Sequence, residues 1–481
     1  MRKNTQFTIL AMAALASFAQ ATDYSTWAKY RTVTLNTTGI TSAAVKKIPV
    51  ALRFTAAAQF DMFTGSTAAL ASGADIRVTK ADGTTDVPYE IESWTTGASG
   101  SGVVWVLLDS VAANSASAYG LRVYWNKAAV STTSNSAAVF DTANGYLAVW
   151  HFKAGAGNVV DATVNAYAGV ATGTPTDNTT SMLGNGKNFD GSAYYTVGTG
   201  TTLSLNTETG PYTITAWSLP TSCSARITIA SKYANDNSAG TRQFALQTGP
   251  TSTNYRMTNN PTSFSSLTSA NEFVADAAGA CVDNTWTFLA GQYNTNSVAP
   301  TADATGAAFV SLAVDGGTPV TGSTANQATG SSIGTSAPFL IGNISSFDRY
   351  MNGTIDELTV SNVARSQDFI KLTYETQKAS PTAITVAALS TPPTALLPGM
   401  RAQAGFGIHR TGSKVTFKLP AGVQGATVSV MDLSGREVWS RNVSADAREV
   451  SWNGVKTSGL FVARTVLTSG GIAAESKLLL P

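Results

Sequence analysis

Through the middle of the chain, short segments alternate between apolar and polar residues and are separated by turns that contain Gly or Asn. Examples are PYTITAWSL, WTFLAGQYN and FVSLAVDGG. Because a strand turns successive side chains to opposite faces, a period of two predicts strands with one buried face. Asp315-Gly316-Gly317 is a turn sequence typical of tight hairpins. Many such strands at near-regular spacing predict an all-β protein built from modular β-sandwiches.

The composition agrees with this class and excludes others. Charged residues make up 12% of the 481 residues, against about 25% in an average globular domain. The net charge of +2, without a basic stripe, excludes nucleic acid as a partner. Two His and two Cys exclude Cys/His metal clusters and leave little material for His-based catalysis.

Residues 1–21 have the pattern of a secretory signal peptide. Arg2 and Lys3 precede a short apolar stretch, and Ala19-Gln20-Ala21 forms a cleavage site of small residues. No other apolar run approaches the roughly 20 residues that cross a membrane. The sequence therefore predicts an exported mature protein without a transmembrane segment.

The two cysteines, Cys223 and Cys281, lie 58 positions apart. In an exported chain we expect a disulfide between them, because the compartment is oxidising. Closing a loop of this length contributes roughly 4 kcal/mol in the chain-entropy picture. Two separate buried thiols are the alternative.

Residues 22–145 contain the alternating segments IPVALRF and YGLRVYW and the apolar strand VVWVLL, which together predict an antiparallel β-sandwich. With WAKYRTVTLNTTG, GADIRVTKADGTTDVPYEIESW and VWHF, these motifs resemble, in order, the family called domain of unknown function 2341. The resemblance implies a fold and no chemistry. Glu90 and Glu92 share one strand face, where we expect two solvated carboxylates rather than a catalytic pair.

Residues 146–378 predict a second sandwich. The elements FDGS, TAWS and the closing G-x-IDE-x-x-x-x-x-x-AR resemble the LamG-like, concanavalin A-like jelly roll. The resemblance implies glycan recognition outside the cell and, in many jelly rolls of this type, a structural calcium ion.

Residues 379–400 are rich in Pro and Ala and predict a linker to a small β-sandwich over 401–481. VSVMDLSGREVW, SGLFVART and the terminal KLLL resemble the C-terminal sorting domain of the type IX secretion pathway of didermic bacteria. This resemblance implies secretion machinery as a partner and a secreted or outer-surface location. A packing role without sorting is the alternative.

The segment MNGTIDELTVSNVARS places two carboxylates, Asp356 and Glu357, side by side in a strand. Strict alternation turns them to opposite faces, which argues against a cooperating acid/base pair. The E-x-D-x-x-E motif of laminarinase-like glycosidases is absent from the sequence. We therefore expect a protein that is not an enzyme.

Alternation also gives Asp356 the same parity as the apolar Leu358 and Val360. A buried carboxylate must be compensated. Two compensations stay open: a calcium ion bound by Asp356 together with Asp190, or backbone N–H donors without a metal.

Five residues are candidates for ligand binding. Aromatic faces can stack on sugar rings, and loops often carry binding groups. The set is Trp217, Tyr233, Phe347, Arg349 and Tyr350. For Trp217 the alternative is a packing residue, and we interpret His151 as a satisfied interdomain histidine rather than a ligand or base.

These patterns lead to one expected function. The chain is expected to bind a polysaccharide or glycan through its central jelly roll. A structural or adhesive surface protein that binds other proteins is the second hypothesis, and a polysaccharide-degrading hydrolase is the third.

Overall fold

The structure of the protein is a computed structural model that describes most of residues 23–390 and the strands that follow. The described residues are 23–198, 202–203, 205, 210–233, 242–249, 253–259, 273–294, 310–322, 337–345, 347–390, 407–411, 413–419, 426–432, 436–444, 449–453, 459–467 and 472–480. The predicted signal peptide lies outside this part of the chain. Two compact units are present, Met1–Pro392 and Pro393–Pro481.

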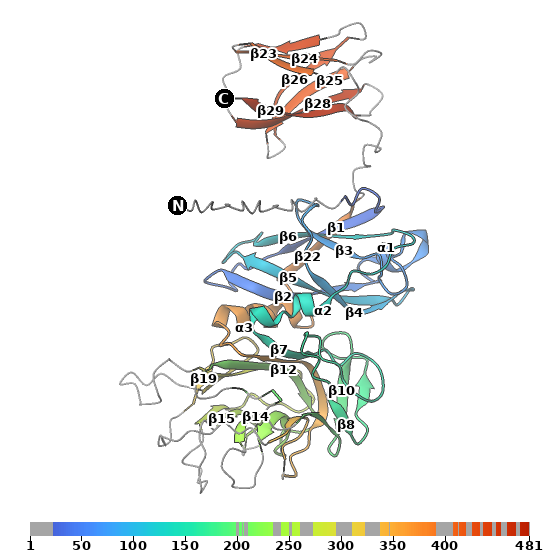
Figure 1. The fold of residues 1–481 in the computed structure, drawn as a ribbon. Helices are drawn as coiled ribbons and strands as arrows, with labels where there is room; N and C mark the ends of the chain where they lie inside the picture. The colour runs from blue at the N-terminus through green and yellow to red at the C-terminus, as the bar shows by residue number, and fades with distance from the viewer. Residues whose placement is uncertain are drawn as a thin grey trace, which may run out of the picture. The chain divides into compact units, whose positions relative to one another are not determined.

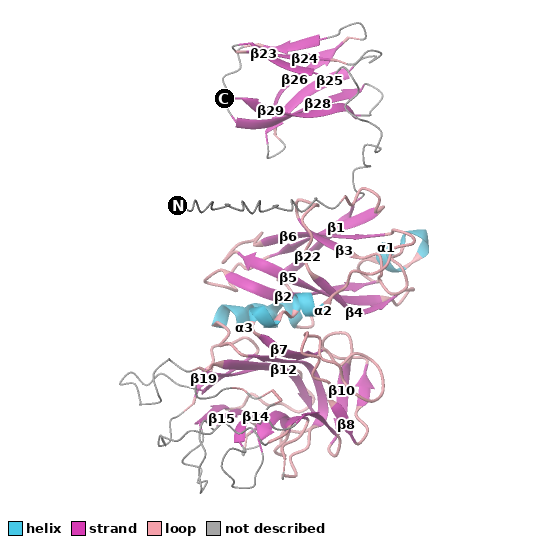
Figure 2. Ribbon diagram, in the orientation of Figure 1, coloured by secondary structure: helices cyan, strands magenta, loops and turns pink. Residues whose placement is uncertain are grey.

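The first domain of unit 1 is a sandwich of two antiparallel sheets (Figures 1 and 2). The first sheet has the order β22 (Ile384–Ser390), β1 (Lys29–Leu35), β6 (Tyr119–Trp125) and β3 (Arg77–Lys80). The second has the order β2 (Val45–Thr55), β5 (Ser101–Val111) and β4 (Tyr89–Thr95). The short helices α1 (Phe60–Phe63) and α2 (Ser136–Val139) and the 3-10 turns Gly65–Thr67 and Thr142–Asn144 complete it.

Strand β22 corrects the predicted linker. It comes from residues 384–390, within the Pro- and Ala-rich segment, and pairs antiparallel with β1, with Leu35 opposite Ile384. The backbone N–H of Asn36 also donates to the carbonyl of Ala383, at 2.8 Å. The chain thus returns to its first domain after completing the second. The jelly roll is an insertion within the first sandwich.

The second domain of unit 1 is a two-layer jelly roll whose core lies between its sheets. One sheet consists of β19 (Val320–Thr321), β18 (Val310–Val314), β17 (Thr287–Tyr293), β12 (Tyr212–Pro220), β21 (Asn352–Ser361), β10 (Gly186–Asp190) and β9 (Thr176–Asn178), with β7 (Tyr146–Trp150) paired to β21. The other consists of β16 (Phe273–Ala277), β15 (Tyr255–Asn259), β14 (Arg242–Thr248), β13 (Thr228–Tyr233), β20 (Phe339–Ile341), β11 (Tyr194–Gly198) and β8 (Val170–Thr172). The all-β prediction is confirmed.

Helix α3 (Gln367–Gln377) lies between the two domains (Figure 2). Ser366 caps its N-terminus, where the hydroxyl accepts a hydrogen bond from the N–H of Phe369. Phe369 and Leu372 enter the core of the first domain, and Ile370 packs on the outer face of the jelly roll. At the C-terminal end, the Arg53 guanidinium donates to the last carbonyls of the helix. One helix therefore joins both cores.

Unit 2 is a small sandwich in the residues that the structure describes. Its sheets are β23 (Gly407–Thr411), β24 (Lys414–Lys418) and β27 (Glu449–Trp452), and β26 (Glu437–Val443), β25 (Ala426–Asp432), β28 (Gly459–Leu467) and β29 (Ile472–Leu480). Val415, Phe417, Val428 and Val430 form the centre of its core. None of the helices described in either unit has the length and apolar character needed to cross a membrane.

The predicted disulfide is confirmed, since Cys223 and Cys281 are bonded and their Cα atoms lie 5.9 Å apart. We expect Cys223→Ser to lower the free energy of unfolding by about 2–4 kcal/mol, because the unfolded chain gains the freedom of an open loop. Denaturant unfolding of the oxidised protein measures this loss. Cys281→Ser is the matched control and must give the same value. A larger loss in the double variant than in either single variant would contradict the assignment.

Candidate functional site

A β-bulge in β21 sets the direction of the two adjacent carboxylates. Thr359 pairs with Thr215, and Asp356 pairs with Trp217, so β21 has one residue more than β12 between these two pairs. Glu357 takes up the extra residue with a left-handed φ of +50°. A bulge of this kind shifts the alternation of side chains along the strand.

The bulge changes which face of the sheet the side chains of β21 occupy, relative to the prediction. Ile355 and Leu358 both lie in the jelly-roll core, although they are three positions apart. Asp356 and Glu357 therefore both leave the core side of the sheet. The expectation that they face oppositely, with Asp356 in the core, is wrong, because strict alternation assumes a regular strand.

Asp356 is fully buried and accepts three hydrogen bonds. Its donors are the N–H of Leu183 at 2.8 Å, the Ser181 hydroxyl at 2.8 Å and the N–H of Glu357 at 2.9 Å. Burial, followed by the charge of Glu357, raises the pKa of Asp356 well above its usual value. Protein donors thus compensate this carboxylate, as in the second of the two interpretations left open by the sequence.

Asp190 lies too far along the sheet to share an ion with Asp356. Its register partner on β21 is Asn352, four residues before Asp356, a separation of about 13 Å along a strand. Asp190 is exposed and accepts hydrogen bonds from the N–H and hydroxyl of Ser192. The predicted calcium pair is therefore wrong, because register separates its members. Calcium binding elsewhere in the domain stays a prediction.

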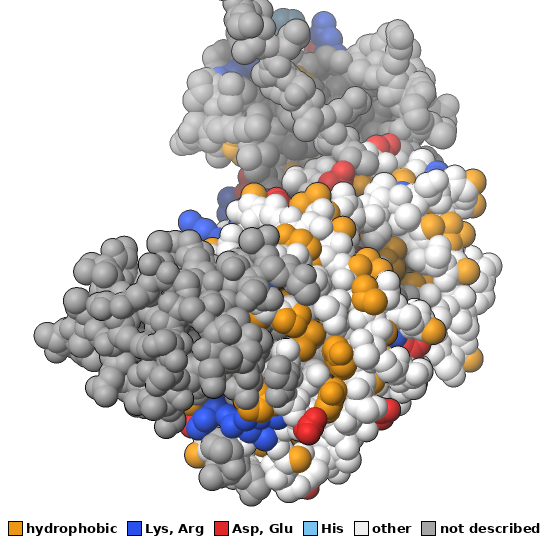
Figure 3. Space-filling model, turned by 60° about the horizontal axis from the view of Figure 1, so that its bottom comes forward, with side chains coloured by type: hydrophobic (Ala, Val, Ile, Leu, Met, Phe, Trp, Pro, Cys, Tyr) orange, Lys and Arg blue, Asp and Glu red, His pale blue; other side chains and the backbone are white. Residues whose placement is uncertain are grey.

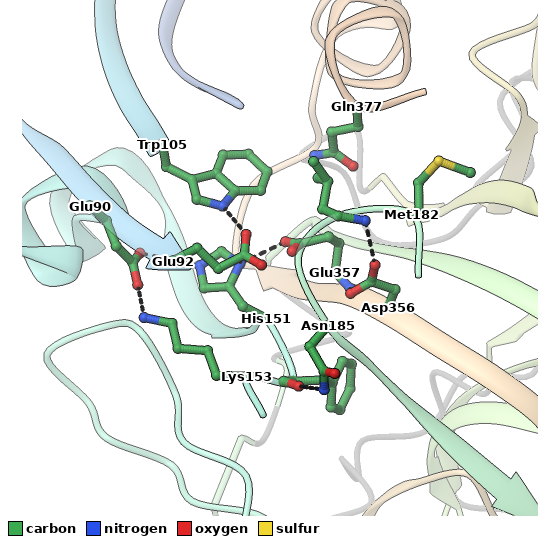
Figure 4. A network of polar contacts seen from close by, with 12 residues as sticks. Glu90, Glu92, Trp105, His151, Lys153, Met182, Asn185, Asp356, Glu357 and Gln377 are labelled. Carbon is green, nitrogen blue, oxygen red and sulfur yellow. Dashed lines mark hydrogen bonds and ion pairs between the residues drawn. The ribbon is translucent and has the colours of Figure 1, made fainter. Parts of the chain in front are cut away.

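Four buried side chains meet where the two domains join, and we call them the interdomain cluster: Glu90, Glu92, His151 and Glu357 (Figure 4). His151 Nδ1 lies 2.7 Å from Glu357 Oε2 and 3.9 Å from Glu92 Oε2. His151 Nε2 lies 3.2 Å from Glu90 Oε2. Strand β4 supplies both first-domain carboxylates, and His151 follows the end of β7.

The split pairing of β21 explains why this cluster forms at the bulge. The first half of β21 pairs with β10, and its second half pairs with β7. Glu357 lies between these two halves, so its side chain meets His151 just beyond β7. The first domain then covers this gap with Glu90 and Glu92.

The charges in the cluster are strongly coupled. Burial disfavours the imidazolium, but the charges of Glu357 and Glu90 outweigh it and raise the pKa of His151 well above its usual value. Burial opposes ionisation of Glu90, yet His151 and then Lys153 lower its pKa to about 2. Burial, then the charge of Glu357, raises the pKa of Glu92 well above its usual value.

The interdomain cluster corrects the expectation that Glu90 and Glu92 are solvated. The sequence did not predict that the four residues of the cluster meet. Glu90 and Glu92 share a face as predicted, but they are 2% and 7% exposed rather than solvated, because the second domain covers them. His151 lies at the junction where the sequence places it. Its carboxylate partners come from sequence positions about 60 and 206 residues away. The only feature of the sequence that pointed to the cluster was that Glu90 and Glu92, in YEIES, share one face of a strand.

Phe347, Arg349 and Tyr350, the predicted ligand-binding residues of the 347–350 loop, are all half-buried and make two separate contacts. The Arg349 guanidinium lies 4.0 Å from the ring centroid of Phe347. The rings of Tyr350 and Tyr194 lie 6.0 Å apart. Tyr233 is buried and packs in a small cluster that Phe347 also contacts. Figure 3 shows one face of the molecule, where Lys and Arg side chains lie beside hydrophobic ones.

Trp217 is separate from this loop, and its position corrects the expectation that it offers a ring to a sugar. It does project from the outer face of the jelly-roll sheet, but helix α3 covers it and leaves it 2% exposed. Its ring stacks on Tyr374, and its indole N–H donates to Gln377 Oε1 at 2.8 Å. Trp217 is a packing residue, because a helix that alternation could not reveal lies over it.

Comparison with protein families confirms two of the resemblances. Residues 189–371 match the concanavalin A-like lectin/glucanases superfamily, and residues 72–148 match the domain of unknown function 2341. No curated protein matches the chain.

The solved structures that match the chain have low sequence identity and low TM-scores. Domain 4 of an extracellular arabinanase from Geobacillus stearothermophilus, in complex with arabinotriose, is 15% identical, covers 48% of this chain and 98% of its own, and has a TM-score of 0.29. A carbohydrate-binding module of a Ruminococcus gnavus sialidase, bound to sialyllactose, is 16% identical to this chain. The match covers 39% of this chain and 96% of the module, with a TM-score of 0.27. The binding domain of botulinum neurotoxin serotype D is 10% identical to this chain. The match covers 69% of this chain and 74% of the neurotoxin domain, with a TM-score of 0.34.

Proposed function

We propose that this chain is an exported glycan-binding protein whose jelly roll recognises polysaccharide through the 347–350 loop and the neighbouring turn between β10 and β11. The observation that carries the proposal is the pair of half-buried rings of Tyr350 and Tyr194, on a concanavalin A-like domain. Partly covered rings present a rigid apolar face at low entropic cost.

Polar groups suited to sugar hydroxyls lie next to these rings. Exposed Asp190 and Asn352 are register partners, and the N–H of Gly191 donates to the carbonyl of Met351, so the turn and the loop touch. A few polar groups beside an apolar face are typical of small-molecule binding sites. We expect the rings to supply most of the affinity and the polar groups the orientation.

Export is part of the proposal. The disulfide between Cys223 and Cys281 fits an oxidising compartment, and the leader-like residues 1–21 fit secretion. On this view unit 2 acts as the sorting domain that its sequence resembles, and the protein is released or held at the outer surface of a didermic bacterium.

Binding without hydrolysis is favoured by the burial of the acids. Ligand atoms of Glu92 and Glu357 lie within 4.8 Å of one another, close to the roughly 5 Å spacing in retaining glycosidases. Their side chains are each about 1% exposed, however, so a sugar cannot reach them. We therefore propose that the interdomain cluster does not cleave glycans.

Polysaccharide pull-down with the full chain tests the proposed function. We expect retention on insoluble plant cell-wall polysaccharide or isolated bacterial envelope, and a loss of about tenfold or more in affinity for Tyr350→Ala. Tyr30→Ala, on β1 of the first domain, is the matched control and should bind normally. Runs with and without calcium test the calcium prediction. Retention on no polysaccharide would contradict the proposal and favour a protein-binding adhesin.

A further inference from the structure

We propose that Glu92, His151 and Glu357 bind one divalent transition-metal ion, of the zinc or manganese class, which joins the two domains of unit 1. Each residue offers one ligand atom, and the three atoms lie within 4.8 Å of one another. Ligands at about 2.0–2.2 Å from an ion lie roughly 3–4 Å apart, so a small inward movement completes this site. Glu92 comes from the first domain, and the other two come from the second.

Unpaired buried oxygens point to a missing partner at this place. Glu92 Oε1 and Glu357 Oε1 are buried and have no hydrogen-bond donor. Buried carboxylate oxygens without a partner are costly, and native structures seldom leave them so. A bound cation would give both oxygens a direct partner, whereas the Arg53 guanidinium acts on the two carboxylates by its charge without bonding to these atoms.

The backbone also makes room for the Glu92 carboxylate. Gly184 has a φ of +46°, and a Cβ atom added there would lie 1.9 Å from Glu92 Oε1. Glycine is needed at this point, because any side chain would enter the space that the carboxylate occupies.

The surroundings of His151 match those of a metal-binding imidazole. When Nδ1 binds a metal, Nε2 usually donates to a carboxylate that fixes the ring. Glu90 Oε2 is the nearby carboxylate, 3.2 Å from Nε2, but the two atoms are not aligned as a hydrogen bond. Trp105 Nε1 donates to Glu92 Oε2 at 2.8 Å and orients that ligand. Glu90 is a positioning residue here, and it is itself paired with Lys153.

The donor set selects the class of ion. Calcium and magnesium prefer oxygen ligands alone, whereas one imidazole nitrogen with two carboxylates suits zinc, manganese or iron(II). A metal ion at this place would replace the contact between His151 Nδ1 and Glu357 Oε2, which lie 2.7 Å apart. The charge of a dication would offset the charges of the two carboxylates, beside the Arg53 guanidinium that also acts on them.

Metal analysis of the full chain, without a histidine tag, tests the proposal. After chelator treatment, addition of Zn²⁺ or Mn²⁺ should restore about one ion per chain and raise the Tm by on the order of 5 °C. Calcium should do neither. Glu92→Gln should bind no ion and show no metal-induced shift in Tm, yet fold, because the amide oxygen still accepts from Trp105.

Two control variants separate this site from surface binding. His409→Asn alters the other histidine of the chain, and Glu437→Gln alters an exposed carboxylate outside both proposed sites. Both should keep one ion and the full shift in Tm. Failure of the wild-type chain to take up Zn²⁺ or Mn²⁺ would overturn the proposal. So would uptake by Glu92→Gln equal to that of the wild type.

Discussion

Replacing Trp217 by alanine is expected to lower the free energy of unfolding of unit 1 by about 3–5 kcal/mol, the usual cost of removing a fully buried large aromatic side chain. The indole contacts Phe288 and Tyr374, with ring centroids 5.3 and 5.7 Å away. The substitution also leaves the buried Gln377 Oε1 without its donor. Denaturant unfolding of the full chain measures the loss.

Trp217→Phe is the matched control for this prediction. It keeps an aromatic ring beneath α3 and removes the N–H donor, so we expect a loss of about 1–3 kcal/mol. If Trp217→Ala abolished glycan binding at unchanged stability, the packing role would be wrong and the side chain would belong to the binding site.

Removing β22 is expected to have the second large effect. A chain that ends at residue 380 loses the strand that pairs with β1 and the buried Ala383. It also loses the carbonyl of Ala387 that accepts from Arg31 at 2.8 Å. Because an edge of the first sandwich is then unpaired, we expect a loss on the order of 3 kcal/mol or more and increased aggregation.

A chain that ends at residue 392 is the control for this truncation. It lacks unit 2 but keeps β22, and we expect its first unfolding transition to match that of the full chain. Thermal unfolding combined with hydrogen exchange at β1 distinguishes the two. Equal protection of β1 in both truncations would show that β22 adds nothing to the first domain.

The bulge at Glu357 shows where sequence reasoning fails. Alternation along β21 is correct on each side of it and wrong across it, because one extra residue reverses every later side chain. The segment IDEL, residues 355–358, contains no glycine or proline that would indicate a bulge. Pairing with two different neighbours, β10 and β7, creates it, and those contacts are distant in sequence.

For the ligand-binding candidates, too, the prediction succeeds where residues are close in sequence and fails where a distant segment packs on them. Tyr350, Phe347 and Arg349 are close in sequence, so their grouping follows from one loop. Trp217 has the predicted outward parity and is nevertheless covered, since α3 arrives from residues about 150 positions later. The side-chain period reveals a face of a strand and does not reveal what lies on that face.

The strands, the two-layer sandwiches, the disulfide and the resemblances of the first two domains could all be predicted from the amino-acid sequence. The strands and sandwiches depend on side-chain period and turn residues, which neighbouring residues encode. The disulfide joins the two cysteines of the sequence. The insertion of the jelly roll into the first sandwich and the cover that α3 places over Trp217 are visible only in the folded chain. The same holds for the meeting of Glu90, Glu92, His151 and Glu357. Those outcomes depend on strand pairing and domain contact between distant segments, because burial and charge coupling are properties of the assembled surfaces.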